Sequence, residues 1–272
     1  MTPTPRRKHE WKDEYTLLCE RCGYILEDLD HALPCPECGK PISESLPERR
    51  VGTPWQQKPG FKSLLQTWWM TVKHPLKTLD AINLNERMTM GLATSSLLYS
   101  GGFIYLLIQM IEIMNPYSDL TVRLTSLGGI GSAILLITIF VVLTVIELTG
   151  LKVISKSRGF RITEPVAYQI VNHGSVGWVW CGTFIALSFY CLVQSGMHNT
   201  NWNEYPPLPW SQRPFVTGYT LSIYYKNLSL ILFLLSLVGF IFFETFAYLG
   251  LRRCKYANRT RPNPAPNQTP KP

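Results

Sequence analysis

Apolar residues gather in four long runs along the chain, at positions 88–114, 124–151, 166–195 and 228–251. Each run exceeds the roughly 20 residues that a helix needs to cross a bilayer. A soluble core helix of this length normally keeps a polar face, yet positions 134–146 offer only two threonines. The pattern therefore predicts four transmembrane helices rather than four buried helices of a soluble protein.

Residues 61–83, ahead of the first run, carry apolar side chains at helical steps of three and four. Pro75 predicts a break near His74, with a second short helix beginning at the proline. Tryptophans and lysines along such a stripe are typical of a helix lying among anionic headgroups of the inner leaflet. The membrane-interface residues of this prediction are Lys62, Trp68, Trp69, Lys73 and Lys77. The alternative is a helix packed on the membrane helices themselves.

Charged residues are unevenly distributed. Residues 1–50 hold 8 basic and 10 acidic side chains, whereas the much longer stretch 88–251 holds only 7 and 6. Cations near the apolar runs concentrate in segments 152–165 and 252–271, which lie on one side of a four-span arrangement. The positive-inside rule then predicts that both termini are cytoplasmic. The first 30 residues lack the apolar core of a cleavable signal peptide.

Four cysteines form the strongest local motif, as two CxxC pairs separated by twelve residues. The pairs are Cys19 with Cys22, and Cys35 with Cys38. This spacing is typical of a tetrahedral zinc site with four thiolate ligands, and four sulfurs leave no open position for catalysis. Disulfides are disfavoured in the cytoplasm, and iron is the minor alternative to Zn2+. We therefore expect a structural zinc ribbon with short flanking strands.

The cysteine segment is acidic. Positions 13–48 hold nine carboxylates, opposed only by Arg21 and Lys40. Zinc with four thiolates adds a charge of about −2. Phosphate backbones need a basic patch, so a nucleic-acid partner is not expected. A cytoplasmic protein partner, or no partner at all, is favoured.

The stretch CERCGYILEDLDHALPCPECGKPISESLPERRVGTPWQ, from Cys19 onward, resembles the head of a group of bacterial membrane proteins. Those proteins begin with a CxxCGY…CPECG zinc ribbon, followed by a basic linker and a helical membrane domain. The resemblance implies a bacterial inner-membrane location. The lead-in Trp68-Trp69…His74-Pro75 is similar to that of Yip-type membrane domains, which implies a role in membrane traffic or shaping.

These features together predict an all-α polytopic membrane domain of about four transmembrane helices with a small N-terminal zinc ribbon. The expected segments are a disordered N-terminus (1–14), the zinc ribbon (15–46), a linker (47–60), an interfacial amphipathic segment (61–83), the transmembrane domain (84–254) and a disordered tail (255–272).

Two carboxylates fall near the inner ends of the second and fourth apolar runs, Glu147 and Glu244. Intramembrane carboxylates are costly and often functional, so they form a candidate ion site. The alternative is that each is satisfied locally by a neighbour. Three function classes follow: a non-enzymatic scaffold that docks a partner through the ribbon, a small transporter or channel using the carboxylates, and a lipid enzyme. No HExxH or GxSxG motif supports the enzyme, so the scaffold is favoured.

Overall fold

The computed structural model describes residues 13–84, 90–114, 121–200 and 215–261, and within them all regular elements are helices. Four segments are long and apolar enough to cross a membrane, as predicted. They are Gly91–Met110, Gly129–Arg158, Glu164–Ser195 and Leu221–Arg253. The predicted fold class, an all-α domain with four such helices behind a small cysteine-bearing head, is confirmed.

The long helices are α4 (Met90–Met114), α5 (Thr121–Arg158), α7 (Val176–Thr200) and α8 (Phe215–Arg253). A shorter helix, α6 (Glu164–Gly174), precedes α7, and the two are separated at Ser175. The third apolar run, predicted as one stretch over 166–195, is therefore divided between two helices.

The chain folds as two compact units. The first combines residues 1–89, 147–173 and 246–272, and the second combines residues 90–146 and 174–245. Both α5 and α8 contribute residues to each unit. The division separates the candidate carboxylates, because Glu147 belongs to the first unit and Glu244 to the second.

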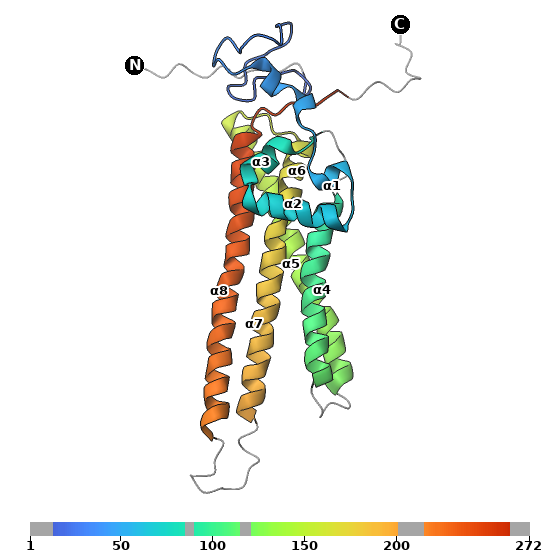
Figure 1. The fold of residues 1–272 in the computed structure, drawn as a ribbon, viewed down its shortest axis with the longest axis vertical. Helices are drawn as coiled ribbons and strands as arrows, with labels where there is room; N and C mark the ends of the chain where they lie inside the picture. The colour runs from blue at the N-terminus through green and yellow to red at the C-terminus, as the bar shows by residue number, and fades with distance from the viewer. Residues whose placement is uncertain (1–12, 85–89, 115–120, 201–214, 262–272) are drawn as a thin grey trace, which may run out of the picture. The chain divides into compact units, whose positions relative to one another are not determined.

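Close helix packing organises the second unit, in which α4 and α7 lie side by side (Figure 1). The Ser100 hydroxyl on α4 donates to the Trp178 carbonyl of α7 at 2.7 Å. A Cβ added at Gly177 would lie 2.5 Å from the Gly239 carbonyl oxygen, so α7 and α8 meet backbone to backbone. Small residues permit such approach between helices in lipid. The fully buried ring of Trp178 packs between α7 and α8, and its centroid lies 4.4 Å from the ring centroid of Phe243.

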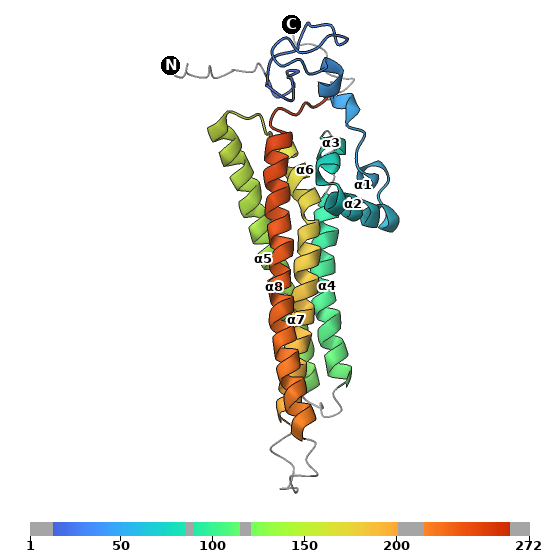
Figure 2. The ribbon, with the colours of Figure 1, turned by 60° about the vertical axis from the view of Figure 1, so that its left-hand side comes forward.

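Short helices of the first unit precede the apolar ones. They are η1 (Ile42–Ser45), η2 (Pro47–Arg49), α1 (Pro54–Gln57), α2 (Phe61–Lys73) and α3 (Pro75–Ala81). The predicted break at His74 is present, with Pro75 at the first position of α3. In both views α1, α2 and α3 lie beside α6 (Figure 1, Figure 2). Thr53 Oγ1 lies 3.2 Å from His173 Nε2, which joins this group to α6.

Helix α2 has two apolar sides. Leu64 is buried within the first unit, whereas Phe61, Leu65 and Trp69 are exposed, Trp69 at 66%. The Lys73 ammonium lies 5.7 Å from the Trp69 ring centroid on the exposed side. One side of α2 thus packs on its own unit, and the other presents an apolar and cationic surface of the kind that interfacial helices carry.

Candidate metal centre

Two equivalent turns carry the four cysteines. In each turn the first cysteine's N–H donates to the carbonyl five residues later, from Cys19 to Tyr24 and from Cys35 to Lys40, both at 2.8 Å. Gly23 (φ +82°) and Gly39 (φ +70°) close the turns in the left-handed region. Residues with a Cβ are disfavoured in that region, so each turn depends on glycine.

The two turns belong to a duplicated unit with an offset of 16 residues. Leu26 N–H donates to the Leu17 carbonyl at 2.8 Å, and Ile42 N–H donates to the Leu33 carbonyl at 3.2 Å. The predicted short strands are reduced to two isolated bridges, Leu18 with Ile25 and Pro34 with Pro41, again 16 apart. We did not detect this repeat in the sequence, although aligning the chain with itself at that offset superimposes all four cysteines and both glycines.

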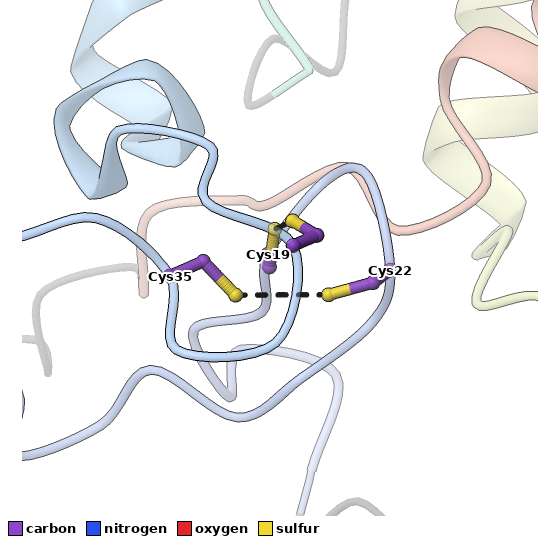
Figure 3. A group of neighbouring side chains, drawn as sticks. Cys19, Cys22 and Cys35 are labelled. Carbon is purple, nitrogen blue, oxygen red and sulfur yellow. Dashed lines mark hydrogen bonds between the residues drawn. The ribbon is translucent and has the colours of Figure 1, made fainter.

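The four sulfur atoms lie within 4.8 Å of one another. Sγ of Cys19 is 3.5 Å from Sγ of Cys38. Sγ of Cys22 is 3.7 Å from Sγ of Cys35, and these two side chains point toward each other (Figure 3). A zinc–sulfur bond of about 2.3 Å places tetrahedral ligands about 3.8 Å apart, so the spacing fits a metal ion. It does not fit a disulfide of about 2.05 Å, and all four thiols are free.

Backbone N–H groups point at the sulfurs. The pKa of Cys19 is lowered to about 7: burial raises it, but hydrogen bonds from the N–H groups of Cys22 and Arg21 outweigh this effect. Burial, together with the thiols of Cys19 and Cys35, raises the pKa of Cys22 and of Cys38, despite N–H donors at Tyr24 and Lys40. A divalent cation supplies the charge that deprotonates such a set.

The head has a very small apolar core. Leu26 and Ile42 are buried against Cys19 and Cys35, with a few half-buried neighbours around them. A segment of this size does not bury enough apolar surface to fold alone and requires a metal or disulfides. The four cysteines are thus suited to a structural metal, with His31 exposed in the connecting loop.

A buried ion pair fastens the first CxxC turn to the linker. Glu20, between the first two cysteines, accepts from Arg50 Nη2 at 3.0 Å and from Nε at 3.2 Å. Arg50 Nη1 also donates to the Leu79 carbonyl in α3 at 2.7 Å. Both charged side chains are nearly inaccessible, at 2% for Arg50 and 6% for Glu20.

The C-terminal segment completes the attachment of the head. The Asn258 side chain receives the Leu18 N–H at 2.9 Å and donates to the Leu18 and Ser45 carbonyls at 2.7 and 2.6 Å. Arg161, between α5 and α6, donates to Asn258 Oδ1 at 2.7 Å and also to the Thr16 carbonyl. Burial lowers the pKa of Arg161 to about 10.

These contacts correct the prediction of a disordered tail from residue 255. Residues 255–261 pack on the head, with Asn258 buried and Arg259 bonded to Glu14 at 3.2 Å. The remaining tail residues, 262–272, lie outside the described part of the chain, as do residues 1–12. The prediction failed because the segment's proline-rich, polar composition concealed specific contacts with residues about 240 positions away.

The other predicted site residues lie apart from the cysteines. Lys62, Lys73 and Lys77 are exposed, as is Trp69, while Trp68 is half-buried. Glu147 on α5 and Glu244 on α8 are both half-buried, in different units. Their pairing as an ion site stays a prediction.

The two turn glycines offer a matched test of how the head is held. We expect Gly39→Ala to destabilise the head by about 1–2 kcal/mol, the cost of a side chain in the left-handed region. Gly23→Ala should cost about 1–3 kcal/mol more, because its Cβ would lie 2.9 Å from the ring of Tyr256. The measurement is the free energy of head unfolding, followed by metal release in denaturant. Equal losses, or a difference that persists after Tyr256→Ala, would contradict the contact.

Comparison of the chain with protein-family models, curated proteins and solved structures found no significant match. The resemblance to bacterial ribbon-headed membrane proteins and to Yip-type domains stays a prediction.

Proposed function

We propose that the protein is a non-enzymatic membrane scaffold whose zinc-stabilised head docks a cytoplasmic protein. The proposal includes an inner-membrane location with both termini in the cytoplasm. Four apolar helices supply the membrane anchor, and the closed set of four sulfurs suits a structural ion. The exposed side of α2, with Trp69 and Lys73, would rest on anionic lipid.

The observation that carries the proposal is that the rest of the chain covers one half of the head and not the other. The first half carries Cys19 and Cys22, and the second half carries Cys35 and Cys38. In the first half, Tyr256 lies over Gly23 and Asn258 binds the backbone of Leu18. In the second half, no atom of the described residues lies within 4 Å of a Cβ built on Gly39, and Leu33 is 55% exposed. The C-terminal segment thus covers the first half of the head, and the equivalent surface of the second half is open to a protein partner.

Charge indicates the kind of partner. The segment that covers the first half of the head, residues 255–261, is basic and contains one tyrosine. Its Arg259 and Arg261 form ion pairs with Glu14 and Asp13. The open half and the loop before it display further exposed carboxylates. These are Asp28, Asp30, Glu37 and Glu44. We therefore propose a basic protein segment with an aromatic side chain as the partner of the second half.

Site-specific photo-crosslinking in native membranes tests this proposal. A crosslinking amino acid at position 37, on the second turn, should give one discrete protein adduct. At position 21, the equivalent exposed site on the first turn, it should give much less. Charge reversal at Asp30 should reduce the adduct formed from position 37 by about tenfold, through lost electrostatic complementarity.

A transporter would give a different result. Two results together would reject the scaffold and support a transporter that uses the intramembrane carboxylates. They are equal labelling at positions 21 and 37, and proton or cation flux in liposomes that Glu147→Gln abolishes.

A further inference from the structure

Apart from the cysteine cluster, the first unit contains a basic pocket at the C-terminal ends of α5 and α8. A pocket of about 390 Å³ is lined by Arg158, Phe160, Tyr248, Arg252 and Lys255. Its volume is within the range of roughly 300–1,000 Å³ that small-molecule sites occupy. Three of the five lining residues are cations, and none is acidic.

The protein backbone holds this pocket in shape. Helix α5 ends at Arg158, and Gly159 turns the chain with φ +67° so that the Phe160 N–H donates to the Ser155 carbonyl at 2.9 Å. The Arg161 N–H then donates to the Lys255 carbonyl at 2.7 Å. The end of α5 and the end of α8 are thereby joined through main-chain atoms, so the cations are carried on a fixed frame.

Two of the three pocket cations, Arg252 and Lys255, have aromatic neighbours. Arg252 lies 5.9 Å from the ring centroid of Tyr248, and the Lys255 ammonium lies 6.0 Å from that of Phe160. Among the ion pairs between described residues, none includes Arg158, Arg252 or Lys255. The adjacent Arg253, by contrast, is paired with Asp80 at 2.7 Å. The pocket cations are therefore available to an anion.

The dipoles of helices α5 and α8 cancel only part of the positive charge of the three pocket cations. The C-terminus of a helix carries about half a negative elementary charge, so α5 and α8 together offset about one of the three cations. A charge of about +2 remains, which matches a phosphate monoester of about −1.5 to −2 at neutral pH. The forked guanidinium groups of Arg158 and Arg252 suit bidentate contacts to phosphate oxygens.

The position of the pocket fits the same chemistry. Arg158 and Arg252 lie at the ends of the apolar segments Gly129–Arg158 and Leu221–Arg253. In a bilayer this level falls where the hydrocarbon core gives way to headgroups, and basic pockets at that level bind anionic headgroups. We propose that this pocket binds a phosphate group, supplied either by an anionic phospholipid or by free phosphate. The proposal does not depend on the partner of the head.

The test uses the full-length protein in uncharged detergent. Binding is measured for phosphatidic acid, phosphatidylglycerol, phosphatidylcholine and inorganic phosphate, each added alone. We expect Arg158→Gln and Arg252→Gln each to weaken binding about tenfold or more, since each removes charge-assisted hydrogen bonds. Lys156→Gln, which removes an exposed cation of the same helix outside the pocket lining, is the matched control and should change binding less than twofold.

Each outcome decides the proposal. Loss of phosphatidic acid binding in the pocket variants, with weak inorganic phosphate binding throughout, identifies a lipid headgroup. Loss of inorganic phosphate binding in the same variants identifies free phosphate. Equal binding by wild type, Arg158→Gln and Lys156→Gln overturns the site. So does a wild-type protein that neither prefers anionic over zwitterionic lipid nor binds inorganic phosphate. Unchanged metal content and helicity of the variants establish that the fold is intact.

Discussion

Replacement of Cys35 by serine is expected to remove the metal from the protein and to unfold the head, while the apolar helices stay inserted. The reason is the small core, in which Leu26 and Ile42 are buried mainly against the cysteines themselves. Structural zinc contributes about 10–16 kcal/mol of apparent binding free energy to domains of this kind, so its loss exceeds any reserve of stability. Metal analysis should fall from one equivalent per chain to less than a tenth.

Cys191→Ser is the matched control for this experiment. Cys191 is buried in α7, within the second unit, and its replacement should leave the metal content unchanged. Protease cleavage within residues 13–50 reports head unfolding directly, whereas far-UV circular dichroism reports the apolar helices. Retention of a full equivalent of metal by Cys35→Ser, or loss of helicity, would contradict the assignment of a structural ion confined to the head.

Neutralising Glu20 should have the next largest effect. Arg50 is nearly inaccessible, and among the described residues its ion pair is with the Glu20 carboxylate. Glu20→Gln therefore leaves a cation buried without its counter-charge. Breaking a buried pair in this way costs about 3–5 kcal/mol. We expect the free energy of head unfolding to fall by that amount.

Glu44→Gln serves as the control, since Glu44 is an exposed carboxylate of the same head and should contribute less than about 0.5 kcal/mol. A double variant tests whether the loss of stability comes from the unpaired charge of Arg50 and not from poorer packing around position 20. Arg50→Met combined with Glu20→Gln should recover part of the lost stability, because the uncompensated cation is gone. If Glu20→Gln and Glu44→Gln are equally mild, the ion pair does not hold the head in place.

Features set by local pattern could be predicted from the sequence. The four apolar runs follow from composition, the break at His74 follows from Pro75, and the cysteine cluster follows from two CxxC pairs. Each depends on residues close together in the chain. Periodicity or spacing alone therefore indicates the structure.

Features that depend on long-range contacts could not be predicted in this way. Asn258 stands in a polar, proline-rich tail, and nothing around it indicates that its amide binds the backbone of Leu18. In the sequence Arg161 is one of several cations of segment 152–165, yet the fold buries it against Thr16 and Asn258. The pocket of Arg158, Arg252 and Lys255 likewise joins two distant segments, and positive-inside charge explains its residues equally well until the fold brings them together.

The bond between Leu18 and Asn258 also sets an order of events during synthesis. The two residues are 240 positions apart, and ribosomes add about 5–20 residues per second. Leu18 therefore emerges roughly 12–48 s before Asn258, an interval in which all four apolar helices must be made. The four cysteines are complete early enough to bind a metal ion during this time, but the side that Tyr256 and Asn258 later cover stays open. That side can close only after the C-terminal segment is made, and a chain truncated before residue 254 would leave it open.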